Sequence, residues 1–218
     1  MMTKSVILLS GGLDSLVSLG LKKEELNITL ALTFDYGQKS LSKEVEASKN
    51  ICKYYGVEHK VIKLDWLKNI TNTSLVSDDN VPTKEELFDT IKSAKSVWVP
   101  NRNGLFLNVA ACYADSQDFD YIVIGANKEE AQSFPDNTQE FINRINSEFE
   151  YSTQKHPKVI APLINCNKND IVKLALEHNI PLKFVQSCYA GKHCGKCESC
   201  IRLKKALVEN NAYIEELF

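Results

Sequence analysis

Four cysteines lie close together in the spacing Cys188-x5-Cys194-x2-Cys197-x2-Cys200. All four fall within 13 residues, and two glycines in the same stretch allow the backbone to fold around an ion. Four thiolates form the ligand set of a closed, tetrahedral, structural zinc site. The same ligands also hold iron–sulfur clusters, which remain the alternative. The segment carries too many charged residues to be four unrelated buried thiols, so the sequence predicts a metal site here.

A second group of polar residues surrounds two glycines in the stretch Ser10-Gly11-Gly12-Leu13-Asp14-Ser15. The stretch follows an apolar run and precedes leucines at helical spacing, which predicts a turn between a strand and a helix. Backbone N–H groups there carry partial positive charge, and glycine lets an anion approach them. Ser10 and Ser15 add hydroxyl donors, and Asp14 offers a carboxylate to Mg²⁺. The pattern predicts a phosphate or pyrophosphate site, with a simple tight turn as the alternative.

The elements that must position these residues alternate along the first two thirds of the chain. Apolar runs predict strands at residues 5–9, 27–34, 58–64 and 121–124. Helical periodicity predicts helices over residues 13–21, 42–55, 103–114, 137–149 and 169–177, the fourth starting near Asp136 and the fifth capped near Asn167. Strands that alternate with helices pair in parallel through right-handed crossovers. The predicted fold class is therefore α/β, a doubly wound, mainly parallel, Rossmann-like sheet with a small C-terminal zinc-binding helical segment.

The composition limits the class of function. The 218 residues include 26 Lys and Arg against 28 Asp and Glu, so the net charge of −2 provides no basic field for nucleic acid. The apolar runs are shorter than the roughly 20 residues of a membrane span. We therefore expect a cytoplasmic protein with small-molecule partners. Residues 65–100 are polar and too long for a simple connection, which predicts an insertion that acts as a lid or contacts a partner.

Residues 10–15 read SGGLDS and resemble the SGGxDS loop of the PP-loop enzymes, the N-type ATP pyrophosphatases. They lack the ending of a Walker A loop and the three spaced glycines of a dinucleotide site. The resemblance implies ATP with Mg²⁺, attack of a carboxylate or amide oxygen on the α-phosphorus, and departure of pyrophosphate. It implies an adenine nucleotide alpha hydrolase-like domain over residues 1–180. The implied ATP contacts are Leu8, Leu9, Ser10, Gly11, Gly12, Leu13, Asp14, Ser15, Leu16, Val17 and Ser18.

Further blocks in the same order resemble the 7-cyano-7-deazaguanine synthase family. They lie at residues 33–38 (TFDYGQ), 99–103 (VPNRN), 124–127 (IGAN), 134–136 (FPD), 161–163 (APL) and in the cysteine segment. The resemblance implies 7-carboxy-7-deazaguanine, ammonia and ATP as substrates, on the path to queuosine or archaeosine. The carboxylate would be adenylated and converted to the amide, and a second adenylation would allow elimination to the nitrile. It also implies a homodimer and a zinc-binding segment over residues 181–218.

Several of these blocks follow predicted strands, so they should meet at the carboxyl edge of the parallel sheet, where α/β folds bind ligands. We expect catalytic residues at Asp14, Arg102 and Lys128, with Lys39 as a further charge partner. Arg102 could pair with phosphate or carboxylate, or be a solvated residue at a helix start. We expect substrate contacts from Tyr36, Gln38, Arg102, Asn127, Phe134 and Asp136. Gln38 and Asp136 could recognise a purine-like base, and a helix N-cap is the alternative for Asp136.

The chain departs from the family pattern at residues 134–138. The expected motif is Tyr-Pro-Asp-Cys-Arg, whereas this chain has Phe-Pro-Asp-Asn-Thr, and the spacer between the first two cysteines is shorter than expected. One alternative function is a synthase-like paralogue that amidates or conjugates a deazapurine or another carboxylate. A tRNA-thiolating enzyme would need paired catalytic cysteines and an RNA-binding domain, which the sequence does not display. A zinc module without activity would have no use for Ser10, Asp14 and Ser15.

Overall fold

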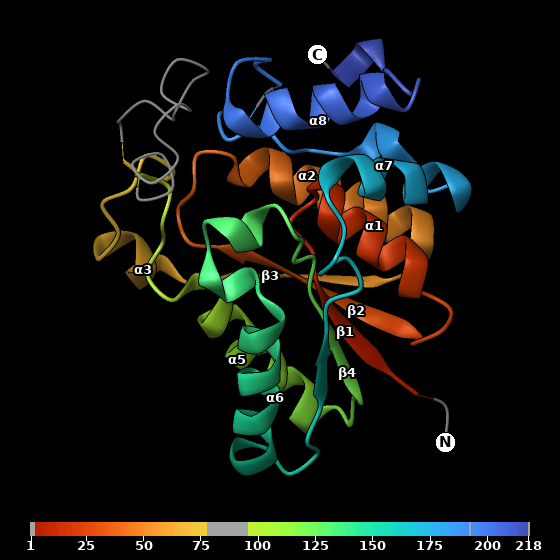
Figure 1. Cartoon of the computed structure of the whole chain (residues 1–218). Coiled ribbons are helices and arrows are strands. Elements are labelled where there is room, and N and C mark those ends of the chain that lie inside the picture. Colours follow the sequence, from red (N-terminus) through yellow and green to blue (C-terminus); the bar gives the residue numbers. More distant parts are fainter. Residues whose placement is uncertain (1–2, 78–95, 192, 218) are drawn as a thin grey trace.

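A single parallel sheet organises the molecule. The computed structural model describes residues 3–77, 96–191 and 193–217, and the sheet has the strand order β3-β2-β1-β4-β5. Every neighbouring pair of strands is parallel. The strands are β1 (Ser5–Leu8), β2 (Ile28–Asp35), β3 (Glu58–Lys63), β4 (Tyr121–Val123) and β5 (Lys158–Ile160) (Figure 1). The order changes direction between β1 and β4, and this switch point leaves a crevice at the carboxyl ends of the strands.

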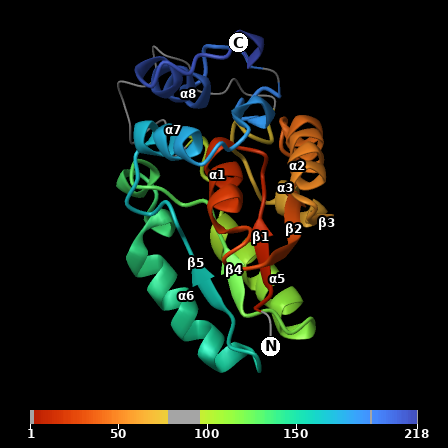
Figure 2. The ribbon, with the colours of Figure 1, turned by 90° about the vertical axis from the view of Figure 1, so that its right-hand side faces the viewer.

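Helices cover both faces of the sheet (Figures 1 and 2). Side chains of β1 alternate between the two faces. Ile7 packs in one hydrophobic cluster, and Val6 and Leu8 pack in the other. The first cluster includes α1 (Leu13–Lys22), α2 (Leu41–Tyr55) and α7 (Lys168–Glu177), and the second includes α5 (Arg102–Ser116) and α6 (Gln139–Ser152). Single 3-10 turns lie at Glu130–Gln132, Pro135–Asn137, Leu182–Phe184 and Glu215–Leu217. The doubly wound parallel α/β fold predicted from the sequence is confirmed.

The last long helix, α8 (Glu198–Glu209), follows the cysteine segment and packs on α7 (Figure 1). Its residues Leu203 and Leu207 are buried in the same cluster as Ile171 and Val172 of α7. This packing joins the cysteine segment to the core and fixes α8 next to the start of α7. In the described part of the chain, no helix is long and apolar enough to span a membrane.

Two predicted details differ from the structure. The short strand β5 was not predicted, because three residues give too little pattern to recognise. Helix α6 begins at Gln139 rather than near Asp136, and the hydroxyl of Thr138 caps it by accepting the N–H of Phe141 (3.2 Å). Asp136 lies in the preceding 3-10 turn, so its N-cap alternative is wrong. The predicted cap of α7 is confirmed, because Asn167 forms a capping box with Asp170.

The structure describes the first and last residues of the predicted insertion at residues 65–100, namely residues 65–77 and 96–100. The first end contains the short helix α3 (Asp65–Asn69). Leu75, Val97 and Val99 are buried against the α5 side of the sheet, so both ends belong to the core. The rest of the predicted lid, residues 78–95, lies outside the described residues.

The cap of α6 gives a test of the local structure. Replacing Thr138→Ala removes the acceptor for the Phe141 N–H and should lower the free energy of unfolding by about 1 kcal/mol. In a chain of this length that corresponds to a fall in the melting temperature of about 2–4 °C. The control Thr138→Ser keeps the hydroxyl and should melt close to the parent protein. Equal melting temperatures for all three proteins would show that Thr138 does not cap the helix.

Candidate active site

A cavity of about 290 Å³ opens at the carboxyl ends of β1 and β4. This volume suits small molecules rather than a polymer. The 10–15 turn, the starts of α5 and α7, the two 3-10 turns after β4 and the segment leading into α8 all contribute to its wall. The charged residues that line it are Asp14, Glu44, Glu130, Asp136 and Glu198, together with Arg102, Lys168 and Arg202.

The glycine turn lines this cavity. Gly11 has a positive φ of 76°, and a Cβ there would lie 2.8 Å from the Cβ of Ala47, so both the conformation and the packing require glycine. Gly12 precedes α1 without a side-chain cap, which leaves N–H groups at the helix start available to an anion. Gly125 lies so close that a Cβ would be 2.8 Å from the Ser15 nitrogen. The hydroxyl of Ser15 donates to the Gly12 carbonyl at 3.1 Å.

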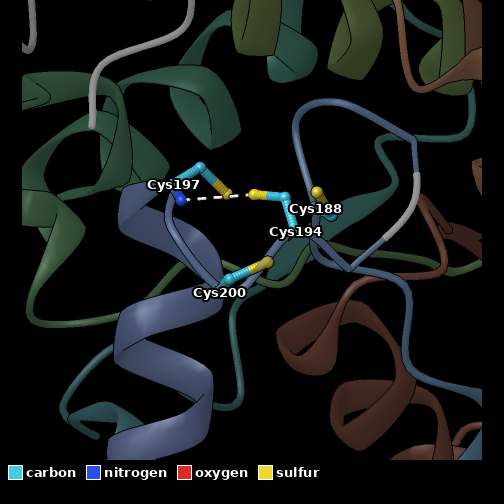
Figure 3. Close-up of side chains that lie close together, drawn as sticks. All are labelled: Cys188, Cys194, Cys197 and Cys200. Carbon is cyan, nitrogen blue, oxygen red and sulfur yellow. Dashed lines mark hydrogen bonds between the residues drawn. The ribbon is translucent and has the colours of Figure 1, made fainter. Parts of the chain in front are cut away.

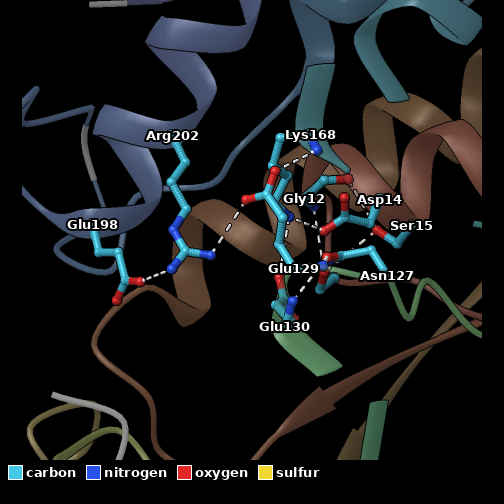
Figure 4. A network of polar contacts seen from close by, with 10 residues as sticks. Gly12, Asp14, Ser15, Asn127, Glu129, Glu130, Lys168, Glu198 and Arg202 are labelled. Carbon is cyan, nitrogen blue, oxygen red and sulfur yellow. Dashed lines mark hydrogen bonds and ion pairs between the residues drawn. The ribbon is translucent and has the colours of Figure 1, made fainter. Parts of the chain in front are cut away.

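Beside the turn, Lys168 of α7 lies between two carboxylates (Figure 4). Its Nζ contacts Asp14 Oδ2 at 2.5 Å and Glu130 Oε1 at 3.1 Å. Burial opposes the charge on Lys168, but Asp14 and Glu130 outweigh it and raise the pKa of Lys168 above its ordinary value. Burial also raises the pKa of Asp14, although Lys168 acts in the opposite direction. The lysine therefore carries a permanent positive charge next to the predicted phosphate site.

The other oxygen of Asp14 has a different environment. Oδ1 is buried and has no hydrogen-bond partner among the described residues. An unpaired buried carboxylate oxygen is costly, which indicates a partner that a nucleotide or its cation would supply. The donor set fits Mg²⁺, because protein sites for this ion commonly use one or two carboxylates together with phosphate oxygens and water.

In the same cavity wall, Arg102 approaches Tyr36 and Asp136. Burial raises the pKa of Tyr36, and a hydrogen bond from Arg102 acts against that shift. Burial also raises the pKa of Asp136, and the charge of Arg102 acts to lower it. The rings of Trp98 and Phe134 stack nearby, with centroids 6.0 Å apart and planes 11° apart. This part of the wall combines a cation, carboxylates and aromatic faces, which is the chemistry that recognises a planar, acidic, nitrogen-rich ring.

The four cysteines form one compact cluster at the start of α8 (Figure 3). Their sulfur atoms all lie within 4.8 Å of one another, and three of the four side chains are buried. The Cys197 N–H donates to the sulfur of Cys194 at 3.3 Å. Such N–H groups stabilise metal-bound thiolates and fix their orientation. The cluster adjoins the cavity, because Cys188 also lines the cavity wall. The predicted ligand set is thus brought together as a candidate metal site.

The sequence comparison decides the family. Residues 4–211 match the family described as "Queuosine biosynthesis protein QueC". The chain belongs to the QueC family. A curated relative from Methanosarcina mazei, named "7-cyano-7-deazaguanine synthase", is 49% identical over 214 residues, which cover 93% of each chain. A relative of the same name from Methanosarcina barkeri is 47% identical with the same coverage.

A solved structure supports the fold of this QueC-family chain. NMN synthetase from Francisella tularensis superimposes with a TM-score of 0.51 over 97% of this chain and 78% of that chain. The sequence identity is 17%, so the similarity concerns the arrangement of the strands and helices alone.

The structure places most of the predicted site residues of the QueC-family chain at the cavity. Those that line it are Leu8, Leu9, Ser10, Gly12, Leu13, Asp14, Ser15, Tyr36, Arg102, Phe134 and Asp136. Gly11, Leu16, Val17 and Ser18 are buried next to the turn and are not among the described residues that line the cavity.

The remaining predicted residues lie elsewhere. Gln38 is buried, and its amide nitrogen donates to the Phe34 carbonyl (2.9 Å) and to Glu44 (2.8 Å). Asn127 is buried and accepts the N–H groups of the next two glutamates. Lys39 and Lys128 are exposed. None of these four is among the described residues that line the cavity.

Sequence reasoning missed several groups at the cavity, among them Lys168, Glu130 and Trp98. Lys168 is the most important, and its signal was a lysine at a helix start, where the helix dipole disfavours a positive charge. Glu130 comes three residues after the 124–127 block, which ends at Asn127, but the sequence analysis did not select it. Trp98 precedes the 99–103 block and carried no spacing signal. Their roles depend on contacts between distant segments, which no local pattern reports.

The cysteine cluster gives a second testable prediction. We expect purified protein to contain one metal ion per chain, and Cys200→Ser to lose it and to melt at a lower temperature, because the ligand shell is then incomplete. Cys112→Ser is the matched control, since Cys112 is exposed on α5 and lies outside the cluster. Elemental analysis and thermal unfolding measure both effects. Parent protein without metal, or a Cys200→Ser variant with full metal content, would contradict a four-cysteine site.

Proposed function

We propose that this chain is an ATP-dependent enzyme that converts 7-carboxy-7-deazaguanine and ammonia to 7-cyano-7-deazaguanine. Membership of the QueC family and relatives named 7-cyano-7-deazaguanine synthase support this function. The structural observation that carries it is that the glycine turn and the Arg102 group line the same cavity. A phosphate site and a site for a carboxylate-bearing ring are thereby close enough for one to react with the other.

In the first half of the reaction, a carboxylate oxygen attacks the α-phosphorus of ATP, and the bond to pyrophosphate breaks. The helix start at Gly12 and the ammonium of Lys168 would hold the departing pyrophosphate, whose charge increases as it leaves. Mg²⁺, when bound, would share that charge through the phosphate oxygens. Asp14 would hold the ion through Oδ1, the buried oxygen that lacks a partner among the described residues.

Arg102 would orient the carboxylate of the substrate. Asp136 would accept N–H groups from the aminopyrimidinone edge of the ring, because an ionised carboxylate is a pure acceptor and that edge carries donors. Trp98 and Phe134 would supply an aromatic face. These residues come from the end of the insertion, the start of α5 and the turns after β4, so the substrate would contact all three segments.

The second half of the reaction requires nitrogen chemistry. Ammonia displaces AMP from the acyl adenylate and forms the amide, with release of one proton. The amide oxygen then attacks a second ATP, and pyrophosphate leaves. Loss of AMP and of both remaining N–H protons forms the carbon–nitrogen triple bond. No covalent bond to a side chain is needed. The enzyme contributes positions and charges, and the same phosphate site serves both adenylations.

We propose zinc as the ion held by the four cysteines. Tetrahedral Zn–S bonds place the sulfur atoms about 3.8 Å apart. The observed cluster, with its sulfur atoms within 4.8 Å of one another, needs small shifts to meet that geometry. We also expect residues 1–180 to form the ATP-binding domain and residues 181–218 the zinc-binding segment. The family resemblance implies a homodimer, and the short apolar runs favour a cytoplasmic location.

The direct test of this function is a product assay. Purified protein is incubated with 7-carboxy-7-deazaguanine, ATP, Mg²⁺ and ammonium, and the products are followed by mass spectrometry. We expect the nitrile together with AMP and pyrophosphate, and accumulation of the amide when ATP is limiting. If this acid is not consumed while ATP is cleaved with other carboxylates, the chain is an adenylating paralogue and the proposed substrate is wrong.

A second test concerns Asp14. Replacing Asp14→Asn keeps the shape of the side chain but removes the charge proposed to hold Mg²⁺, so we expect ATP cleavage to fall by at least about a hundredfold with the fold intact. Asp118→Asn, at an exposed position, should behave as the parent protein. Steady-state kinetics and circular dichroism measure the two properties. ATP cleavage at the parent rate by the Asp14→Asn variant would exclude the proposed role of this carboxylate.

A further inference from the structure

Two consecutive glutamates contact the same lysine in different ways (Figure 4). Glu130 pairs with the side chain of Lys168, whereas Glu129 Oε1 accepts the backbone N–H of Lys168 at 2.8 Å. Lys168 is the first residue of α7, and its N–H is one of the groups at a helix start that lack a partner within the helix. Glu129 thus caps α7 from another segment of the chain. A negative charge at this end of a helix is also favoured by the helix dipole.

The loop that carries the two glutamates has a fixed shape. The side-chain oxygen of Asn127 accepts the N–H of Glu129 at 3.0 Å and the N–H of Glu130 at 3.1 Å. The backbone N–H of Lys128 donates to the carbonyl of Cys166 at 3.0 Å. These bonds tie the loop after β4 to the segment that leads into α7, so a shift of the loop would move Lys168.

Glu129 has a second partner on α8, the helix that carries Cys200 of the cysteine cluster. Its Oε2 pairs with a guanidinium nitrogen of Arg202 at 3.5 Å, and Arg202 also pairs with Glu198 (Figure 4). Arg202 lies on α8, two residues after Cys200. Glu129 therefore joins the start of α7 to α8. It is not among the described residues that line the cavity, so it would act on the reaction through Lys168.

We infer that Glu129 is a positioning residue, which Arg202 orients and which fixes the start of α7 so that the ammonium of Lys168 lies beside Asp14. The inference rests on the proposed function, in which Lys168 holds the departing pyrophosphate. It also gives the four-cysteine segment a part in the chemistry, because α8 is the element that brings Arg202 to Glu129.

The test compares two substitutions at position 129. Glu129→Ala removes the acceptor for the Lys168 N–H, and a displacement of the lysine by about 1 Å should lower kcat by roughly ten- to a hundredfold. Glu129→Gln keeps an oxygen at the same place, so kcat should stay within about threefold of the parent value. KM for ATP should change little in both variants, and the metal content should be unchanged. A merely structural role would lower the melting temperature without lowering kcat in Glu129→Ala alone.

Arg202 provides an internal control of the mechanism. If Arg202 acts through Glu129, the double variant Glu129→Ala with Arg202→Ala should be no slower than Glu129→Ala alone. Arg144→Ala is the matched control, because Arg144 pairs with Glu140 on exposed α6 in the same i,i+4 arrangement that joins Glu198 to Arg202. It should have the parent kcat.

Hydrogen exchange at the start of α7 gives a readout that does not depend on activity. Amides of residues 168–170 should exchange faster in Glu129→Ala and at the parent rate in Glu129→Gln. Parent kcat and parent exchange in Glu129→Ala would overturn the inference while the product assay still stands. A parent protein that forms no nitrile would instead refute the proposed function, and the exchange data would still decide whether Glu129 fixes α7. Parent ATP cleavage by a Lys168→Ala variant would overturn the inference, because Glu129 is inferred to act through this lysine.

Discussion

The site is built around one buried ammonium group that must keep its charge. Removing a cation from water costs several kcal/mol unless carboxylates pair with it, and Lys168 has two such partners in Asp14 and Glu130. Asp14 lies 154 positions away in the sequence and Glu130 lies 38 positions away. The three side chains can meet only after β1, β4 and α7 have packed. Two carboxylates against one ammonium leave a net negative charge, which favours a phosphate that arrives with its divalent cation.

A backbone hydrogen bond links the start of the cysteine segment to the glycine turn of this site. The N–H of Gln186 donates to the carbonyl of Gly11 at 2.8 Å, and Cys188 follows two residues later in the cavity wall. The backbone of the glycine turn is therefore held from one side by β1 and from the other by the segment that begins the cysteine cluster. A metal ion that orders this cluster would also stabilise the turn, even though it lies outside the reacting atoms.

The sequence was sufficient for those parts of the fold that depend on local pattern. Alternating apolar runs predicted four of the five parallel strands, and Asn167 was recognised as a cap because its partner Asp170 is three residues away. The four cysteines were assigned from spacing alone. Lys168 could not be recognised in this way, because its partners are distant in sequence. Asn127 was selected as a ligand contact, yet its buried side chain shapes the loop that holds Lys168.

The departure of residues 134–138 from the motif that the family resemblance led us to expect can be understood from the local contacts. The Asn137 amide donates to Asp136 Oδ1 at 3.1 Å, and the Thr138 hydroxyl both accepts from Phe141 and donates to the Pro135 carbonyl at 2.7 Å. Both substituted residues therefore stabilise the turn that carries Asp136. A cysteine and an arginine at these positions could not supply the same amide and hydroxyl bonds. Asn137 and Thr138 thus stabilise the turn that holds Asp136 at the cavity wall. Arg102 supplies the positive charge that interacts with Asp136.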